Sequence, residues 1–256
     1  MRFAVPMIES FALARAFAGN AALMLHARGV SKIFTLHGQG GMTIDALSQV
    51  SIDVCAGECV ALTGPSGAGK STLLRCMYGN YLASAGAIAV RTGPRAGDHV
   101  VLTHVGAHDV IRLRRDVIGY VSQFLRAIPR VPALALVAAP LIARGVAERD
   151  AAERAASLLA RLNVPERLWP LAPATFSGGE QQRVNIARGL IAEQPILLLD
   201  EPTASLDAAN RDVVAELIVE ARRRGTAIVG IFHDDAMRER VATRCFELRA
   251  PSRRAA

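Results

Sequence analysis

Lysine is almost absent from this chain, and aromatic residues are scarce. Only Lys32 and Lys70 among the 30 basic residues are lysines, and aromatic residues make up 5% of the chain. The net charge of +7 would suit a nucleic-acid partner, but basic patches that bind single strands usually include aromatic stacking platforms. Here the arginines are spread along the chain without such a platform, so we expect solvated helix faces and no nucleic-acid partner.

Metal-binding cysteine pairs and long hydrophobic runs are also missing. The four cysteines have neither the spacing of a zinc site nor the density of a disulfide scaffold, so we expect reduced core residues in a cytoplasmic protein. No run of 18 or more uncharged apolar residues occurs, and we therefore expect no transmembrane segment in this chain. Its 256 residues, 51% of them hydrophobic, suffice for one large domain or for a domain with an inserted subdomain.

The strongest motif is a glycine-rich loop between a predicted strand and a predicted helix. Residues 64–72 read Gly-Pro-Ser-Gly-Ala-Gly-Lys-Ser-Thr and fill the phosphate-loop pattern G-x-x-x-x-G-K-[ST] at every fixed position. The glycines let successive backbone N–H groups point at phosphate oxygens, and the helix N-terminus adds its dipole. We expect Lys70 to contact the β- and γ-phosphates of a nucleotide and Ser71 to bind Mg²⁺.

Polar residues follow three further predicted strands. Gln123, the pair Asp200-Glu201 and His233 each stand at the end of an apolar run. Because the carboxyl ends of parallel strands lie at one edge of a sheet, these side chains should converge on the nucleotide. We expect Asp200 to hold Mg²⁺ through water and Glu201 to orient and polarise the attacking water, while His233 contacts the γ-phosphate or holds Glu201.

A second helix start with glycines lies at residues 176–183, which read Phe-Ser-Gly-Gly-Glu-Gln-Gln-Arg. A hydroxyl and two glycines at a helix N-terminus form another anion cradle, which a single nucleotide does not need. Here the sequence resembles the ATP-binding cassette (ABC) ATPases, in which this signature completes the site of a partner subunit. The resemblance covers residues 22–248 and implies a head-to-tail dimer, either of two copies or with a related ATPase.

The resemblance assigns every motif of that family to a position in this chain. It implies ATP and Mg²⁺ as cofactors, with an aromatic ring stacked on adenine and a D-loop at residues 205–207. The implied catalytic residues are Glu201, His233 and Lys70, and the implied metal ligands are Ser71, Gln123 and Asp200. The implied nucleotide-binding residues are Phe34, Gly64, Pro65, Ser66, Gly67, Ala68, Gly69, Lys70, Ser71, Thr72, Gln123, Ser177, Gly178, Gly179, Glu180 and Asp207.

The implied fold class is α/β, the P-loop NTPase fold of ABC type. It has a mainly parallel sheet, an antiparallel β appendage from strands at 22–30 and 47–54, and an inserted helical subdomain at about 124–190. Residues 22–248 form the ATPase domain, and 249–256 form a basic tail. Because Met24 stands where the first strand begins, we expect residues 1–21 to be a dispensable extension, disordered or the result of a misassigned start. A short helix at 8–18 is the alternative.

Four segments between the motifs bear on the biological role. Residues 77–82, 123–130, 162–169 and 230–234 resemble the PhnL-type ATPases of phosphonate carbon-phosphorus lyase systems. This implies a partnership with carbon-phosphorus lyase core subunits and with synthesis of ribose 1-methylphosphonate 5-triphosphate. The alternative is the energy-coupling ATPase of an ABC membrane transporter, which would carry the same motifs. A DNA-repair or chromosome ATPase would have coiled-coil or zinc insertions that the sequence lacks. Phe124 and Leu125 fit either core burial or partner docking.

Overall fold

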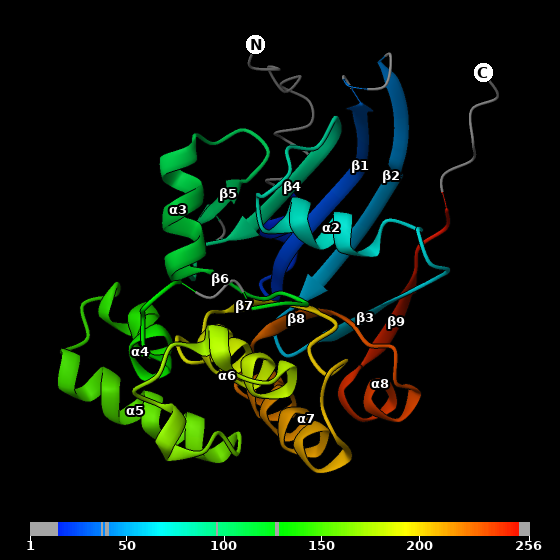
Figure 1. Ribbon diagram of the computed structural model, residues 1–256. Coiled ribbons are helices and arrows are strands. Elements are labelled where there is room, and N and C mark those ends of the chain that lie inside the picture. The colour runs from blue at the N-terminus through cyan, green and yellow to red at the C-terminus, as the bar shows by residue number, and fades with distance from the viewer. Residues whose placement is uncertain (1–14, 37, 39–40, 96, 126–127, 251–256) are drawn as a thin grey trace.

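Two sheets with helices packed on them form the fold (Figure 1). The computed structural model describes residues 15–36, 38, 41–95, 97–125 and 128–250. Residues 1–14 of the predicted N-terminal extension, which include the start of the alternative helix at 8–18, and residues 251–256 of the predicted tail lie outside this description. The α/β architecture, with one parallel and one antiparallel sheet, confirms the predicted fold class.

The parallel sheet has five strands in the order β6, β7, β8, β3 and β9. They span, in that order, Ile118–Val121, Ile196–Asp200, Ala227–Ile231, Cys59–Thr63 and Arg244–Glu247. All residues of β7 and β8 are buried, as expected for strands covered on both faces. The sequence did not predict β9, because this short edge strand is mostly exposed and has no apolar run to mark it.

The antiparallel sheet has the strand order β2, β1, β4 and β5. These strands span Met42–Cys55, Leu23–Leu36, Ala85–Arg91 and His99–Val101. The strands β1 and β2 are longer than predicted and stay paired from Leu23 opposite Cys55 to Leu36 opposite Met42. Their outer halves escaped prediction because the side chains there are largely exposed or half-buried, and a half-buried ribbon lacks a continuous apolar signal.

Helix α2 (Lys70–Met77) lies between the two sheets (Figure 1). Its buried Leu74 and Met77 belong to one hydrophobic core that also includes Ile88 of the antiparallel sheet and Val229 of the parallel sheet. Helix α3 (Ala107–Asp116) adds Leu113 to the same core. The phosphate-loop helix is therefore fixed from both sides, which places its N-terminus firmly beside the carboxyl ends of the parallel strands.

A second core covers the other face of the parallel sheet. Between β6 and β7 the described chain forms only helices: α4 (Ala133–Ile142), α5 (Glu148–Arg161), two 3₁₀ turns (Glu166–Leu168 and Pro173–Thr175) and α6 (Gly178–Leu190). This confirms the predicted helical insertion. Helices α7 (Ala208–Arg223) and the unpredicted α8 (Asp235–Val241) complete the layer. No described helix is both long and apolar enough to cross a membrane.

The segment before β1 corrects one prediction. Residues 15–19 are helical, and the Phe17 side chain is 1% exposed against Leu23 and Ala89 of the antiparallel sheet. Buried Arg91 holds this segment, because its guanidinium donates hydrogen bonds to the main-chain oxygens of Phe17, Asn20 and Leu23 at 2.7–3.1 Å. This packing of Phe17 argues against the expectation that residues 1–21 are a dispensable extension, and the effect on stability is a matter for experiment.

Replacing Phe17 with alanine is expected to lower the unfolding midpoint by roughly 10 °C. Truncating a buried phenylalanine costs about 3 kcal/mol or more, and each kcal/mol shifts a chain of this size by about 2–4 °C. Thermal unfolding followed by circular dichroism measures the change. The matched control is Arg15→Ala, which alters an exposed residue of the same helical turn. A Phe17→Ala midpoint equal to that of the control would show that the packing adds no stability.

Candidate functional site

The phosphate loop connects β3 to α2 with the geometry that the motif predicts. Gly69 is the N-cap of α2 and has a φ of 91°, where an added Cβ would collide with the Ala46 carbonyl oxygen. Lys70 Nζ donates hydrogen bonds to the carbonyl oxygens of Gly64 and Pro65 at 2.8 and 3.0 Å. The lysine is thus folded over its own loop, with its ammonium placed where the motif requires a cation for phosphate oxygens.

The magnesium-site prediction concerns the buried carboxylate at the end of β7. Asp200 is 1% exposed, and its Oδ1 accepts a hydrogen bond from the Ser71 hydroxyl at 2.9 Å. Its other oxygen, Oδ2, accepts a hydrogen bond from the Tyr120 hydroxyl at 3.0 Å. The structure therefore brings the two predicted ligands, Ser71 and Asp200, together and adds Tyr120, which sequence reasoning missed.

These oxygen donors fit Mg²⁺. No cluster of three or more His, Cys, Asp or Glu side chains suited to a metal occurs among the described residues. Mg²⁺ needs no such cluster, because it is usually held by one or two carboxylates, retained waters and substrate phosphates. Asp200 and the Ser71 hydroxyl would supply the protein oxygens, and the ion would neutralise charge on the phosphates. Gln123, the third predicted ligand, donates from its side-chain nitrogen to Glu201, and its role as a metal ligand stays a prediction.

Glu201 lies between Gln123, which follows β6, and His233, which follows β8. Its Oε2 accepts a hydrogen bond from Gln123 Nε2 at 3.0 Å, and its Oε1 lies 2.7 Å from His233 Nε2. Its backbone φ is 53°, a left-handed conformation that is uncommon outside glycine and often marks functional positions. The strand-end residues thus converge as predicted, and the carboxylate is held at both oxygens in a backbone geometry that stores strain.

A small cavity of about 290 Å³ opens beside this carboxylate. Glu201, His233 and Asp234 line it together with Arg211, whose guanidinium pairs with Asp234 at 2.6 Å. The main cause that holds the pKa of the Asp234 carboxyl below its usual value is the hydrogen bond from the Met237 amide. His233 is 64% exposed at its side chain, so the site remains open to a molecule that approaches from this side.

The signature residues stand at the start of α6. Ser177 Oγ accepts a hydrogen bond from the Glu180 amide at 3.3 Å, and the Glu180 carboxylate accepts hydrogen bonds from the Ser177 hydroxyl and amide at 2.7 and 2.9 Å. These bonds hold the pKa of Glu180 below its usual value. Among the described residues, no hydrogen bond joins this capping box to the phosphate loop.

Asp207, in the predicted D-loop, caps α7. Its carboxylate accepts a hydrogen bond from the Asn210 amide at 2.8 Å, which holds the pKa of Asp207 below its usual value. Phe34 is half-buried at the outer end of β1, with the Tyr81 ring edge-on at 5.2 Å and Lys32 Nζ 4.9 Å from its centroid. The ring has firm neighbours, and its stacking on adenine stays a prediction.

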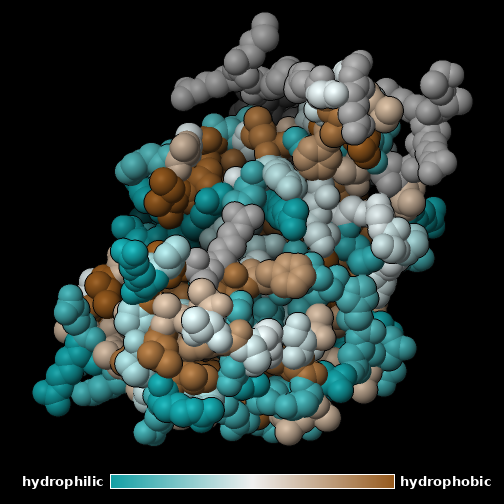
Figure 2. Space-filling view, in the orientation of Figure 1, coloured by the Kyte–Doolittle hydropathy of each residue, from teal (hydrophilic) through white to brown (hydrophobic). Residues whose placement is uncertain are grey.

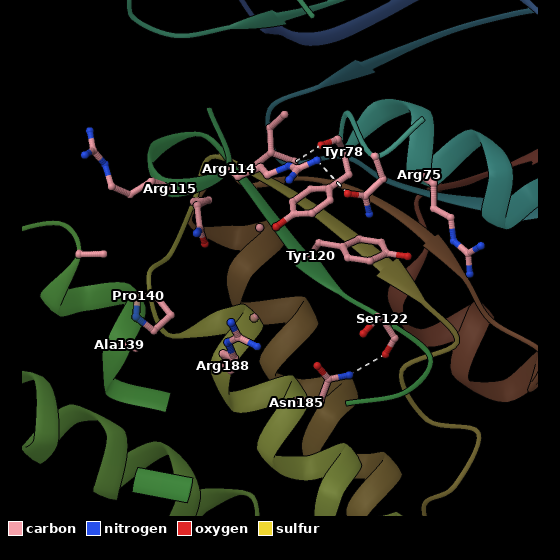
Figure 3. A pocket seen from close by; sticks show the side chains of 16 residues that line it. Arg75, Tyr78, Arg114, Arg115, Tyr120, Ser122, Ala139, Pro140, Asn185 and Arg188 are labelled. Atoms are coloured by element: carbon pink, nitrogen blue, oxygen red, sulfur yellow. Dashed lines mark hydrogen bonds between the residues drawn. The ribbon is translucent and has the colours of Figure 1, made fainter. Parts of the chain in front are cut away.

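A larger cavity of about 510 Å³ lies between the sheet core and the inserted helices (Figure 3). Arginines from three helices line it, and in Figure 3 Arg114 and Arg188 lie on opposite sides of the tyrosines. The rings of Tyr78 and Tyr120 are stacked in its wall, with centroids 4.8 Å apart. No sequence signal identified this cavity, because its lining comes from segments far apart in the chain.

The chain is similar to proteins named as ATP-binding subunits of ABC transporters. The ABC transporter family matches residues 47–204. The lipoprotein-releasing system ATP-binding protein LolD of Gluconobacter oxydans is 40% identical over 205 residues, 79% of this chain and 84% of that protein. An uncharacterized ABC transporter ATP-binding protein of Mycobacterium tuberculosis is 37% identical over 198 residues, 77% of this chain but only 58% of that protein's length.

A solved structure supports the same relationship. The dimeric structure of a post-hydrolysis state of the ATP-binding cassette MJ0796 bound to ADP and Pi has a TM-score of 0.79 and 29% sequence identity. The match covers 89% of this chain and 95% of that one. The family match includes the phosphate loop, the signature and the Asp200-Glu201 pair. The chain therefore belongs to the ABC transporter ATP-binding family.

Proposed function

We propose that this chain is the energy-coupling ATPase subunit of an ABC membrane transporter. The observation that carries this proposal is the convergence of Lys70, Asp200 and Glu201 at the carboxyl ends of parallel strands in a member of the family. The names of the relatives favour transport over phosphonate breakdown, since they are ATP-binding proteins of transport and release systems.

The proposed reaction is ATP hydrolysis. Lys70 exchanges its two main-chain acceptors for phosphate oxygens when ATP enters the loop. Glu201 accepts a proton from the attacking water, and Gln123 and His233 hold its carboxylate in place for that step. Asp200 and Ser71 would hold Mg²⁺, which would neutralise charge on the phosphates.

A dimer is part of this proposal. MJ0796 forms a dimer in the solved structures that this chain resembles. Ser177 is exposed at the start of α6 and makes its side-chain hydrogen bonds within its own capping box. In the proposed head-to-tail dimer this helix N-terminus faces the phosphates bound by the partner chain, which gives the second anion cradle a purpose.

The segment after Gln123 is the proposed docking point for a membrane partner. Phe124 is 71% exposed, whereas Leu125 packs against the helical core. Of the two alternatives left open by the sequence, core burial therefore applies to Leu125, and partner docking remains available to Phe124. Hydrophobic residues on the face in Figure 2 lie in separate patches among hydrophilic ones. Phe124 directly follows Gln123, whose side chain contacts Glu201, so a partner bound at Phe124 would be connected to the nucleotide site.

A role in phosphonate breakdown is the second candidate function, and it rests on the four segments that resemble PhnL-type ATPases. Affinity purification of tagged Glu201→Gln protein with ATP separates the two roles when membranes and soluble extract are processed in parallel. The transporter role predicts recovery of an integral membrane protein from detergent-solubilised membranes. Recovery of carbon-phosphorus lyase subunits from the soluble extract, with no membrane protein, would overturn it in favour of the second candidate.

Phe124→Ser is expected to reduce recovery of the membrane partner at least about fivefold, because a polar side chain loses the apolar contact at the docking point. Ile44→Ser, which changes another exposed apolar residue on β2, is the matched control and should not reduce recovery. Quantitative mass spectrometry of the purified material measures both. Equal recovery with the two variants would place the docking point elsewhere.

A further inference from the structure

Both oxygens of the buried carboxylate at the predicted magnesium site are fixed by hydroxyl groups. Ser71, on the phosphate-loop helix, donates to Oδ1 of Asp200 at 2.9 Å. Tyr120, on the neighbouring strand β6, donates to Oδ2 at 3.0 Å. A carboxylate free at one oxygen can rotate about its terminal bond, since that torsion is broad. Here the second hydroxyl removes this freedom and determines the direction in which Oδ1 points.

The Tyr120 hydroxyl is itself held in place by the surrounding structure. The backbone of Tyr120 on β6 pairs with that of Leu198 on the parallel strand β7, and Leu198 lies two residues before Asp200. Figure 3 shows the ring of Tyr120 beside that of Tyr78. The two rings are stacked, with centroids 4.8 Å apart and planes inclined by 23°. Tyr78 is the C-cap of α2, so the phosphate-loop helix and the sheet together fix the ring.

The Tyr120 hydroxyl is a neutral donor toward this carboxylate, because a phenol is one of the uncharged O–H donors among the side chains. An ionised carboxylate that must bind a cation is best oriented by a neutral donor that leaves its negative charge in place.

We propose that Tyr120 is a positioning residue for the catalytic metal. It acts through Asp200, because its hydroxyl fixes the orientation of the Asp200 carboxylate. The proposal rests on the assignment of Asp200 as a metal-binding residue. Tyr120 touches neither nucleotide nor metal in this scheme. Residues that orient a metal-binding carboxylate in this way commonly change metal affinity about 10-fold to 100-fold when removed.

The test is Tyr120→Phe, which removes one oxygen atom and keeps the ring that stacks on Tyr78. The first readout is ATP hydrolysis as a function of free Mg²⁺ at saturating ATP. We expect the Mg²⁺ concentration for half-maximal rate to rise about 10-fold, with the rate at saturating Mg²⁺ within about threefold of the original protein. The second readout is binding of a fluorescent, non-hydrolysable ATP analogue in the presence of EDTA, which should be unchanged.

Tyr78→Phe is the matched control, because it removes a hydroxyl from the other ring of the same stack. The Tyr78 hydroxyl makes no hydrogen bond to Asp200 in the described structure, so the Mg²⁺ dependence of this variant should equal that of the original protein. Thermal unfolding of both variants checks that the fold is kept.

Two results would overturn the proposal. One is a Tyr120→Phe protein with an unaltered Mg²⁺ requirement, and the other is an equal shift in both variants, which would assign the effect to the ring stack. Failure of the proposed ATPase reaction gives a different result, since the unmodified protein would then hydrolyse no ATP at any Mg²⁺ concentration. The choice between a transporter partner and a phosphonate-lyase partner does not affect this test, because both roles need the same hydrolysis.

Discussion

Glu201→Gln is expected to slow ATP hydrolysis at least about 100-fold while ATP still binds. The amide keeps the shape of the side chain and can still accept a hydrogen bond from Gln123, but it has lost the basic carboxylate that accepts a proton from water. Release of phosphate under single-turnover conditions measures the rate, and equilibrium binding of ATP measures the affinity. The control is Glu153→Gln, which changes an exposed carboxylate on α5 and should hydrolyse ATP normally.

The same variant tests the proposed dimer. Without hydrolysis, ATP should hold two chains together, and light scattering after size exclusion should report a mass twice that of the monomer only when ATP is present. Adding Ser177→Arg should abolish this species, because a long side chain at the exposed N-cap of α6 would obstruct the partner's phosphates. An ATP-dependent dimer that persists in the double variant would contradict the head-to-tail arrangement.

Lys70→Ala is expected to weaken ATP binding about 100-fold. Each hydrogen bond to a charged group contributes about 1.5–3 kcal/mol, and a tenfold change in affinity corresponds to about 1.4 kcal/mol, so losing the only lysine of the loop exceeds a factor of ten. The core should be unaffected, because the hydrogen bonds of the ammonium within the described part of the chain go to the main-chain oxygens of Gly64 and Pro65. Isothermal titration of ATP in the presence of Mg²⁺ measures the affinity.

Arg149→Ala provides the comparison for this loss of charge. Arg149 lies on α5 with its side chain 88% exposed and pairs with Glu153, so its removal lowers the net charge equally without touching the loop. Its ATP affinity should remain that of the original protein. Binding by folded Lys70→Ala protein that matches this control would mean that residues 64–72 do not hold the phosphates.

The sequence predicted those features of the site that depend on residues adjacent in the chain. A phosphate loop is a continuous run whose strand and helix adjoin it, and buried parallel strands such as β7 are apolar runs of recognisable length. Because parallel strands end at one edge, the convergence of Gln123, Glu201 and His233 followed from their places after such runs. These inferences needed only the order of residues along the chain and the rules for parallel sheets.

The unpredictable part depends on contacts between distant segments. Tyr120 reaches Asp200 across 80 positions, and in the sequence it reads only as an interior residue of a strand. Phe17 belongs by sequence to the predicted N-terminal extension, but in the structure its ring stacks on that of His99, with centroids 5.0 Å apart and planes inclined by 9°. Tertiary packing decides such contacts, and neither residue lies in a motif whose spacing would reveal its partner.

Arg91 attaches the N-terminal segment to the sheet in a way that bears on how this region can diverge. Its guanidinium recognises the main-chain oxygens of Phe17, Asn20 and Leu23, groups that every amino acid possesses. The Asn20 side chain has a task of its own, since its Oδ1 accepts a hydrogen bond from the Ala22 amide at 3.0 Å. We expect natural variation to be concentrated at the exposed positions 18 and 21, while position 91 stays arginine and position 17 keeps a large apolar side chain.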